Sequence, residues 1–70
     1  VLESVVKVIY DPAVDVLRII LRDAQVFESD ETRPGVILDY DEDGQILGLE
    51  ILDAASLVSD PRAVELALAG

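Results

Sequence analysis

The sequence predicts one α+β domain, residues 1–70, in which an antiparallel meander of four or five strands carries a short C-terminal helix packed on one face. Three observations lead to this prediction. Apolar and polar residues alternate over several segments with the period of two that strands require. Short turn sequences rich in Asp, Pro and Gly separate these segments, and short connections join antiparallel neighbours. After residue 53 the alternation ends and a spacing typical of helices begins.

The first hairpin is expected to join strands at residues 5–10 and 16–22 through the turn Asp11-Pro12-Ala13-Val14. Leu17 and Ile19 share the face of the second strand that is predicted to enter the core. Matching this face to the apolar face of the first strand requires an even loop, and four residues satisfy that condition.

A third strand is expected at residues 26–32. Its acidic residues and weak alternation are typical of a sheet edge, where charge discourages pairing with other chains. The central hairpin follows, with strands at residues 36–41 and 45–53. Its loop is again expected to be even, either the two-residue turn Asp43-Gly44 or the four residues 41–44.

The C-terminal region is predicted to be helical. Residues 54–58 fit a single helical turn, and Asp60 followed by Pro61 resembles an N-cap and the first helical residue. The helix is expected to span residues 61–69 and to dock on the sheet, because a helix this short is not stable alone.

The second face of the predicted sheet is also rich in aliphatic residues. A single short helix covers only one face, so the other is expected to meet a second copy or another protein. The residues predicted to form this partner or oligomer interface are Ile9, Val16, Ile20, Ile37, Ile46 and Leu52.

The charge balance limits the partners. Fifteen acidic residues against five basic ones give a formal net charge of −10. Such a chain is repelled by nucleic acid and by anionic membranes, and its expected partners are basic proteins or cations. We find no apolar run long enough to span a bilayer and no signal-peptide layout, so the expected location is the cytoplasm.

An acidic stretch in the central hairpin matches the calcium-loop pattern D-x-[DN]-x-[DN]-G-x5-E from Asp39 to Glu50. An EF-hand needs flanking helices, whereas this stretch follows Pro34-Gly35 and continues as a strand. The preferred interpretation is a solvated hairpin turn. Weak divalent-cation binding through Asp41 and Asp43 remains the alternative function.

The residue types argue against an enzyme. The chain has no His and no Cys, so imidazole or thiolate nucleophiles and zinc sites are excluded within it. Two carboxylate pairs could in principle act as acid and base: Asp11 with Asp15, and Asp39 with Glu50. Turn capping and surface ion pairing explain these residues better, and we predict no catalytic residues and no cofactor.

Two spaced motifs resemble a known family. Tyr10-Asp11-Pro12-Ala13-Val14-Asp15-Val16-Leu17 fits a Y-D-x-x-x-D-x-L turn, and Pro34 to Gly44 fits P-G-V-I-x-D-x-D-x-x-G. Gly48 to Ala54 then fits G-x-E-I-L-x-A. The combination resembles the small prokaryotic family named domain of unknown function 2283, over about residues 6–57. The sequence departs slightly from the family pattern at Ala55, which is inserted where the family usually continues from Asp-Ala directly to Ser.

The resemblance implies no known activity. Members of this family resemble the acidic halves of two-gene modules in which a compact basic protein is the toxin. The leading hypothesis is therefore a non-catalytic interaction protein, either a homo-oligomer or the acidic, antitoxin-like partner of a small basic protein.

Overall fold

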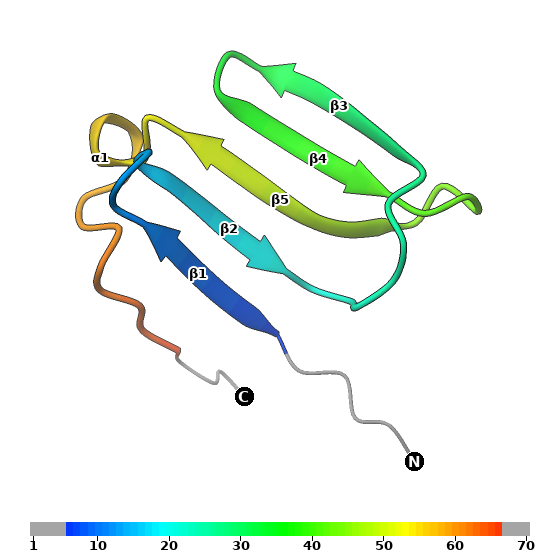
Figure 1. Cartoon of the computed structure of the whole chain (residues 1–70), viewed down its shortest axis with the longest axis horizontal. Coiled ribbons are helices and arrows are strands. Elements are labelled where there is room, and N and C mark those ends of the chain that lie inside the picture. The colour runs from blue at the N-terminus through cyan, green and yellow to red at the C-terminus, as the bar shows by residue number, and fades with distance from the viewer. Residues whose placement is uncertain (1–5, 67–70) are drawn as a thin grey trace.

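The computed structural model describes residues 6–66. Within this range the chain forms five strands and one short helix (Figure 1). The elements are β1 (Lys7–Asp11), β2 (Val16–Ile20), β3 (Glu28–Arg33), β4 (Val36–Tyr40), β5 (Ile46–Leu52) and α1 (Ala54–Leu57).

All strand pairs are antiparallel, and the order across the sheet is β1-β2-β5-β4-β3 (Figure 1). The predicted α+β class with an antiparallel sheet is confirmed. The strand order departs from a sequential meander, because β2 pairs with β5 and residues 21–27 cross to the far edge. This strand order places β5, which is apolar at most positions, between β2 and β4, and it leaves the charged β3 at an edge of the sheet. The predicted edge strand is therefore confirmed.

In the first hairpin the apolar residues of β1 and β2 lie on the same face of the sheet, as expected. Tyr10 pairs with Leu17, and β1 continues through Asp11, so the four-residue loop is shifted by one position to residues 12–15. Asp15 ends this loop in the left-handed region, with φ 55°. Asp tolerates this conformation better than most residues, because its short side chain can bond locally.

The central hairpin keeps its predicted faces but not its predicted loop. Leu38 pairs with Leu49 as expected, yet the loop spans residues 41–45 and is odd. A register shift lies between Asp39 and Tyr40, because their partners on β5 are Gly48 and Ile46. This β-bulge leaves Leu47 without a partner, which absorbs the extra loop residue without turning the apolar face outward.

The approach of β2 to β5 depends on a glycine. A Cβ atom on Gly48 would lie 2.4 Å from the carbonyl oxygen of Ile19, a separation that no side chain tolerates. Beside it, the carbonyl oxygen of Leu47 accepts hydrogen bonds from the backbone N–H groups of Leu21 and Arg22, at 2.8 and 3.1 Å. Gly48 therefore permits the pairing that joins the two hairpins.

The helical turn expected after β5 is present as α1. The prediction of a helix at residues 61–69 is wrong over residues 61–66. The backbone N–H of Arg62 donates to the Asp60 carboxylate, as at an N-cap, but the chain makes one turn and then has no regular structure. A nine-residue helix is marginal without a surface to dock on, and local capping does not replace that surface. Residues 67–69 of the prediction lie outside the described range.

The described residues form little buried core. Only Leu17, Leu47 and Ala54 are buried among the hydrophobic residues of this range, and no large side chain there is fully buried. Figure 1 shows the sheet as a single layer with α1 at one end. Stable domains ordinarily bury a sheet face against a second layer.

Candidate functional site

A surface of uncharged, mostly apolar residues lies on one side of the sheet. Cross-strand partners share a face, so the register places eight residues of β1, β2, β5 and β4 on it. We call this surface the apolar face; it comprises Val8, Tyr10, Leu17, Ile19, Val36, Leu38, Leu49 and Ile51. None of these eight residues carries a charge at neutral pH.

The apolar face is covered only at its margins by the residues described. Leu57 of α1 lies with Val36 and Ile51 at one end. Pro61, Arg62 and Val64 line a hollow together with Val8 and Tyr10 of β1, an edge strand. No described element lies across the middle of the face, and α1 makes no extensive contact with any strand.

The opposite side has a different character, and we call it the mixed face. Arg18 pairs with Glu50 across β2 and β5, with 4.0 Å between Nε and Oε1. Asp39 accepts a hydrogen bond of 2.6 Å from the Ser29 hydroxyl across β3 and β4. Lys7 and Glu31 add further charge toward the two edges.

Five of the six predicted interface residues lie on the mixed face, spaced by these charged side chains: Ile9, Val16, Ile20, Ile37 and Leu52. Ile46 does not continue their row. It lies beyond the bulge and pairs with Tyr40, which alternates onto the side of Leu38. The sequence analysis missed this shift because a bulge changes the alternation of residues without a distinct composition.

A carboxylate clamp joins the first hairpin to α1. Asp15 Oδ1 accepts hydrogen bonds from the Tyr10 hydroxyl at 2.6 Å and from the Ala55 backbone N–H at 3.1 Å. The Asp15 carbonyl oxygen accepts from the N–H of Ala54 at 3.0 Å. Asp53 makes no side-chain cap on α1, so Asp15 supplies an acceptor for its first turn from a distant part of the chain.

This clamp changes the chemistry of Tyr10. The hydrogen bond to the Asp15 carboxylate, followed by partial desolvation, raises the pKa of the Tyr10 hydroxyl above its usual 10.0. Asp11 has a separate role, because its Oδ1 accepts from the Ala13 backbone N–H inside the turn. Both carboxylates of the first pair, Asp11 and Asp15, therefore accept hydrogen bonds from backbone N–H groups of the fold, and Asp11 caps its turn as predicted.

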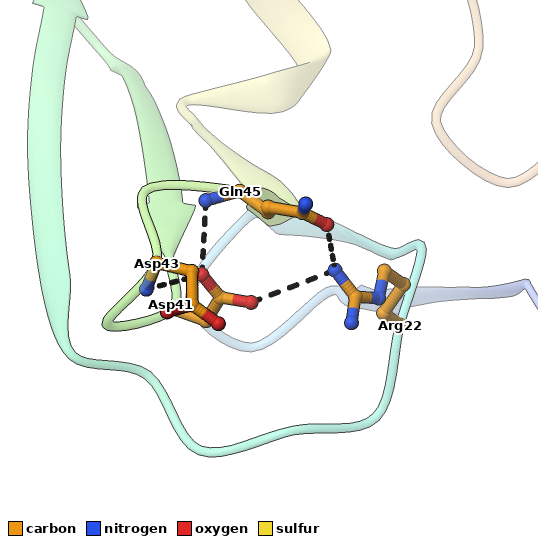
Figure 2. Close-up of polar contacts among 4 residues, drawn as sticks. All are labelled: Arg22, Asp41, Asp43 and Gln45. Atoms are coloured by element: carbon orange, nitrogen blue, oxygen red, sulfur yellow. Dashed lines mark hydrogen bonds and ion pairs between the residues drawn. The ribbon is translucent and has the colours of Figure 1, made fainter.

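The loop of the central hairpin, residues 41–45, is rich in acidic residues, and we call it the acidic tip. Asp41 holds this loop together through several hydrogen bonds (Figure 2). Its Oδ1 accepts from the backbone N–H groups of Asp43 and Gln45, both at 2.9 Å. Its Oδ2 lies 3.5 Å from Nη1 of Arg22, which also donates to the Gln45 side chain at 2.6 Å. A cation at this tip would have to compete with these donors for the Asp41 oxygens.

The calcium-loop match is a hairpin, as interpreted from the sequence. Glu50, the last acidic residue of that match, lies within β5 opposite Arg18 and Ile37 and away from the tip. In residues 6–66 no three His, Cys, Asp or Glu side chains gather closely enough to hold a metal ion. Asp39 and Glu50 share the mixed face as predicted, and each has a polar partner.

The family described as Protein of unknown function (DUF2283) has a model that matches residues 7–54. This span exceeds half of the chain, and it begins with β1 and ends at the buried Ala54. The chain belongs to this family. No curated protein and no solved structure gave a significant match.

The DUF2283 match contains all five strands of the described sheet and most of the clamp. Tyr10, Asp15 and Ala54 belong to the family motifs that this sequence contains. Their contacts give these DUF2283 motifs a structural explanation, since they fasten the first hairpin to the end of β5. In the same described range, no helix has the length and apolar character needed to cross a membrane.

Proposed function

We propose that this DUF2283 protein is a non-catalytic interaction protein whose sheet is completed by another chain. The observation that supports this most strongly is the apolar face, across whose middle no element of residues 6–66 lies. Burial of apolar surface contributes about 25 cal/mol per Å², and it is the dominant favourable term in folding. A single-layer sheet forgoes most of that contribution until a second layer is added.

The carboxylates support a structural role in preference to acid–base chemistry. The Asp15 carboxylate accepts from a backbone N–H of α1, the Asp41 carboxylate accepts from backbone N–H groups of its own loop, and Glu50 faces Arg18. A general acid or base must instead be free to exchange a proton with a substrate.

Two occupants fit this proposal: a second copy of the chain, or a small basic protein as in a toxin–antitoxin pair. The acidic residues of the described chain favour the second occupant at one edge, since Glu28, Asp30 and Glu31 lie exposed on β3. Charged contacts of this kind increase association rates and weaken as salt rises.

Sedimentation velocity across a range of protein concentrations tests the proposal. The protein alone is expected to self-associate, or to remain poorly folded until a basic partner from the native host is added. Salt separates these outcomes, because association through apolar surface persists at high ionic strength while charge-driven association is lost. A well-folded monomer that binds neither itself nor a basic protein would contradict the proposal.

A further inference from the structure

We propose that the apolar face is covered by the apolar face of a second copy of this chain. The two sheets would stack as a two-layer β-sandwich, with the mixed faces directed outward. This inference rests on the proposed function and specifies both the partner and the surface.

The distribution of charge selects a second copy for this face. With a net charge of −10, two copies repel one another wherever acidic residues meet. Four strands contribute no charge to the apolar face, and the acidic residues on the same side, Glu28 and Asp30, lie on the edge strand β3. Two copies can therefore approach through β1, β2, β5 and β4. A basic protein would find no carboxylate there in β1, β2, β4 or β5, and its charges would lose hydration without gaining a partner.

The size of the face suits a dimer. Strands lie about 4.8 Å apart and rise about 3.3 Å per residue, so four strands of five residues cover roughly 19 by 17 Å, or about 320 Å². The relief of the side chains adds about half again, and two copies together bury about 1,000 Å², which is the lower limit for a biological interface. A face stacked on its own copy is also self-complementary under two-fold symmetry.

The other surfaces serve a second copy less well. Stacking through the mixed face would take Arg18 and Glu50 out of water at a separation of 4.0 Å, which recovers little of the desolvation cost. Pairing of two copies along β1, an edge strand, would satisfy backbone groups but leave the apolar face bare. Stacking through the apolar face supplies a second layer without burying this ion pair.

Two neighbouring isoleucines provide a matched test. Ile19 and Ile20 follow one another in β2, both are half-buried, and they lie on opposite faces. Ile19→Glu places a charge inside the proposed interface and is expected to weaken dimerisation at least about 100-fold in sedimentation equilibrium. Ile20→Glu places the same charge on the outward face and is expected to leave the dimer constant within about threefold. Equal effects of the two changes, with both variants folded by circular dichroism, would overturn the inference.

The unaltered protein gives a test that does not depend on folding of the variants. Isotope-filtered NMR on a mixture of labelled and unlabelled chains should detect intermolecular contacts from the methyl groups of Leu38 and Leu49, and none from Ile20 or Ile37. A dimer with contacts from Ile20 and Ile37 would overturn this inference while the proposed function stands. A folded monomer whose apolar face takes up a basic protein would do the same, whereas a folded monomer without any partner would overturn both.

Discussion

Replacing Gly48 with alanine tests how closely β2 approaches β5. The added Cβ would lie 2.4 Å from the carbonyl oxygen of Ile19 and 3.3 Å from the Cα of Ile20, and both are backbone atoms. Neither can rotate away as a side chain would, so β2 must move outward. That movement strains the Ile20–Gly48 pair and the two bonds accepted by Leu47.

The magnitude follows from these contacts. Overpacking costs about 1–3 kcal/mol, and each of the two weakened backbone hydrogen bonds adds about 0.5–1.5 kcal/mol, so Gly48→Ala should reduce the free energy of unfolding by about 2–6 kcal/mol. Gly44→Ala is the control. Its Cβ meets nothing within 4 Å, and only the positive φ of 80° opposes it. That left-handed conformation costs about 1–2 kcal/mol.

Urea unfolding followed by far-ultraviolet circular dichroism measures both variants. The protein concentration must be held constant, because association with a second chain shifts apparent stability. We expect Gly48→Ala to lose clearly more stability than Gly44→Ala. A Gly48→Ala variant that is as stable as the parent, or that loses less than Gly44→Ala, would refute the reasoning about the β2–β5 approach.

Two further predictions concern the clamp and the tip. Because the hydrogen bond to Asp15 favours the neutral Tyr10 hydroxyl in the folded state, its stabilisation is present below pH 10.0 and is lost as pH rises through the raised pKa of Tyr10. In a Tyr40→Phe background the tyrosinate absorbance should therefore appear above pH 10.0, and Asp15→Asn should lower that midpoint; an unchanged midpoint would contradict the clamp. Asp41→Ala removes the acceptor of two backbone N–H groups and should destabilise the protein by about 1–3 kcal/mol in urea unfolding. Glu42→Ala at the neighbouring exposed position should change stability by less than about 0.5 kcal/mol, and equal losses would contradict the capping role of Asp41.

The strands could be predicted because their information is local. Alternation around Leu17 and Leu49 identified the apolar face, and Pro34-Gly35 identified a tight turn, in which Gly35 has φ 81°. The order of the strands could not be predicted in the same way. Pairing of β2 with β5 depends on contacts between residues about thirty positions apart, and no local pattern records them.

The candidate surface was only partly predictable for the same reason. The expectation of a helix at residues 61–69 assigned a cover to the apolar face, and it therefore directed attention to the aliphatic residues of the mixed face. Asp60 and Pro61 are good helix-starting residues, but capping contributes only about 1 kcal/mol and does not sustain a helix without docking. Because residues 61–66 do not form this helix, the apolar face is the stronger candidate for an interface with another chain.

The clamp was missed because both of its partners are explained locally. Asp15 reads as a turn residue and Tyr10 as a strand aromatic, and each interpretation is correct as far as it goes. The Tyr10 hydroxyl donates to Asp15, and Asp15 alone accepts from α1, so these bonds require the first hairpin and the end of β5 to lie together. Tyr10 and Asp15 flank the predicted four-residue turn 11–14, and this spacing is the sequence feature that could have revealed their contact.

The central claim is that another chain completes the layer that this sheet lacks. The most direct measurement is the urea midpoint of the purified protein as a function of its total concentration. If a second copy covers the apolar face, unfolding is linked to dissociation, and the midpoint must rise steadily with concentration. A cooperative transition whose midpoint is independent of concentration, with the protein monomeric throughout, would contradict the claim that two copies form one core.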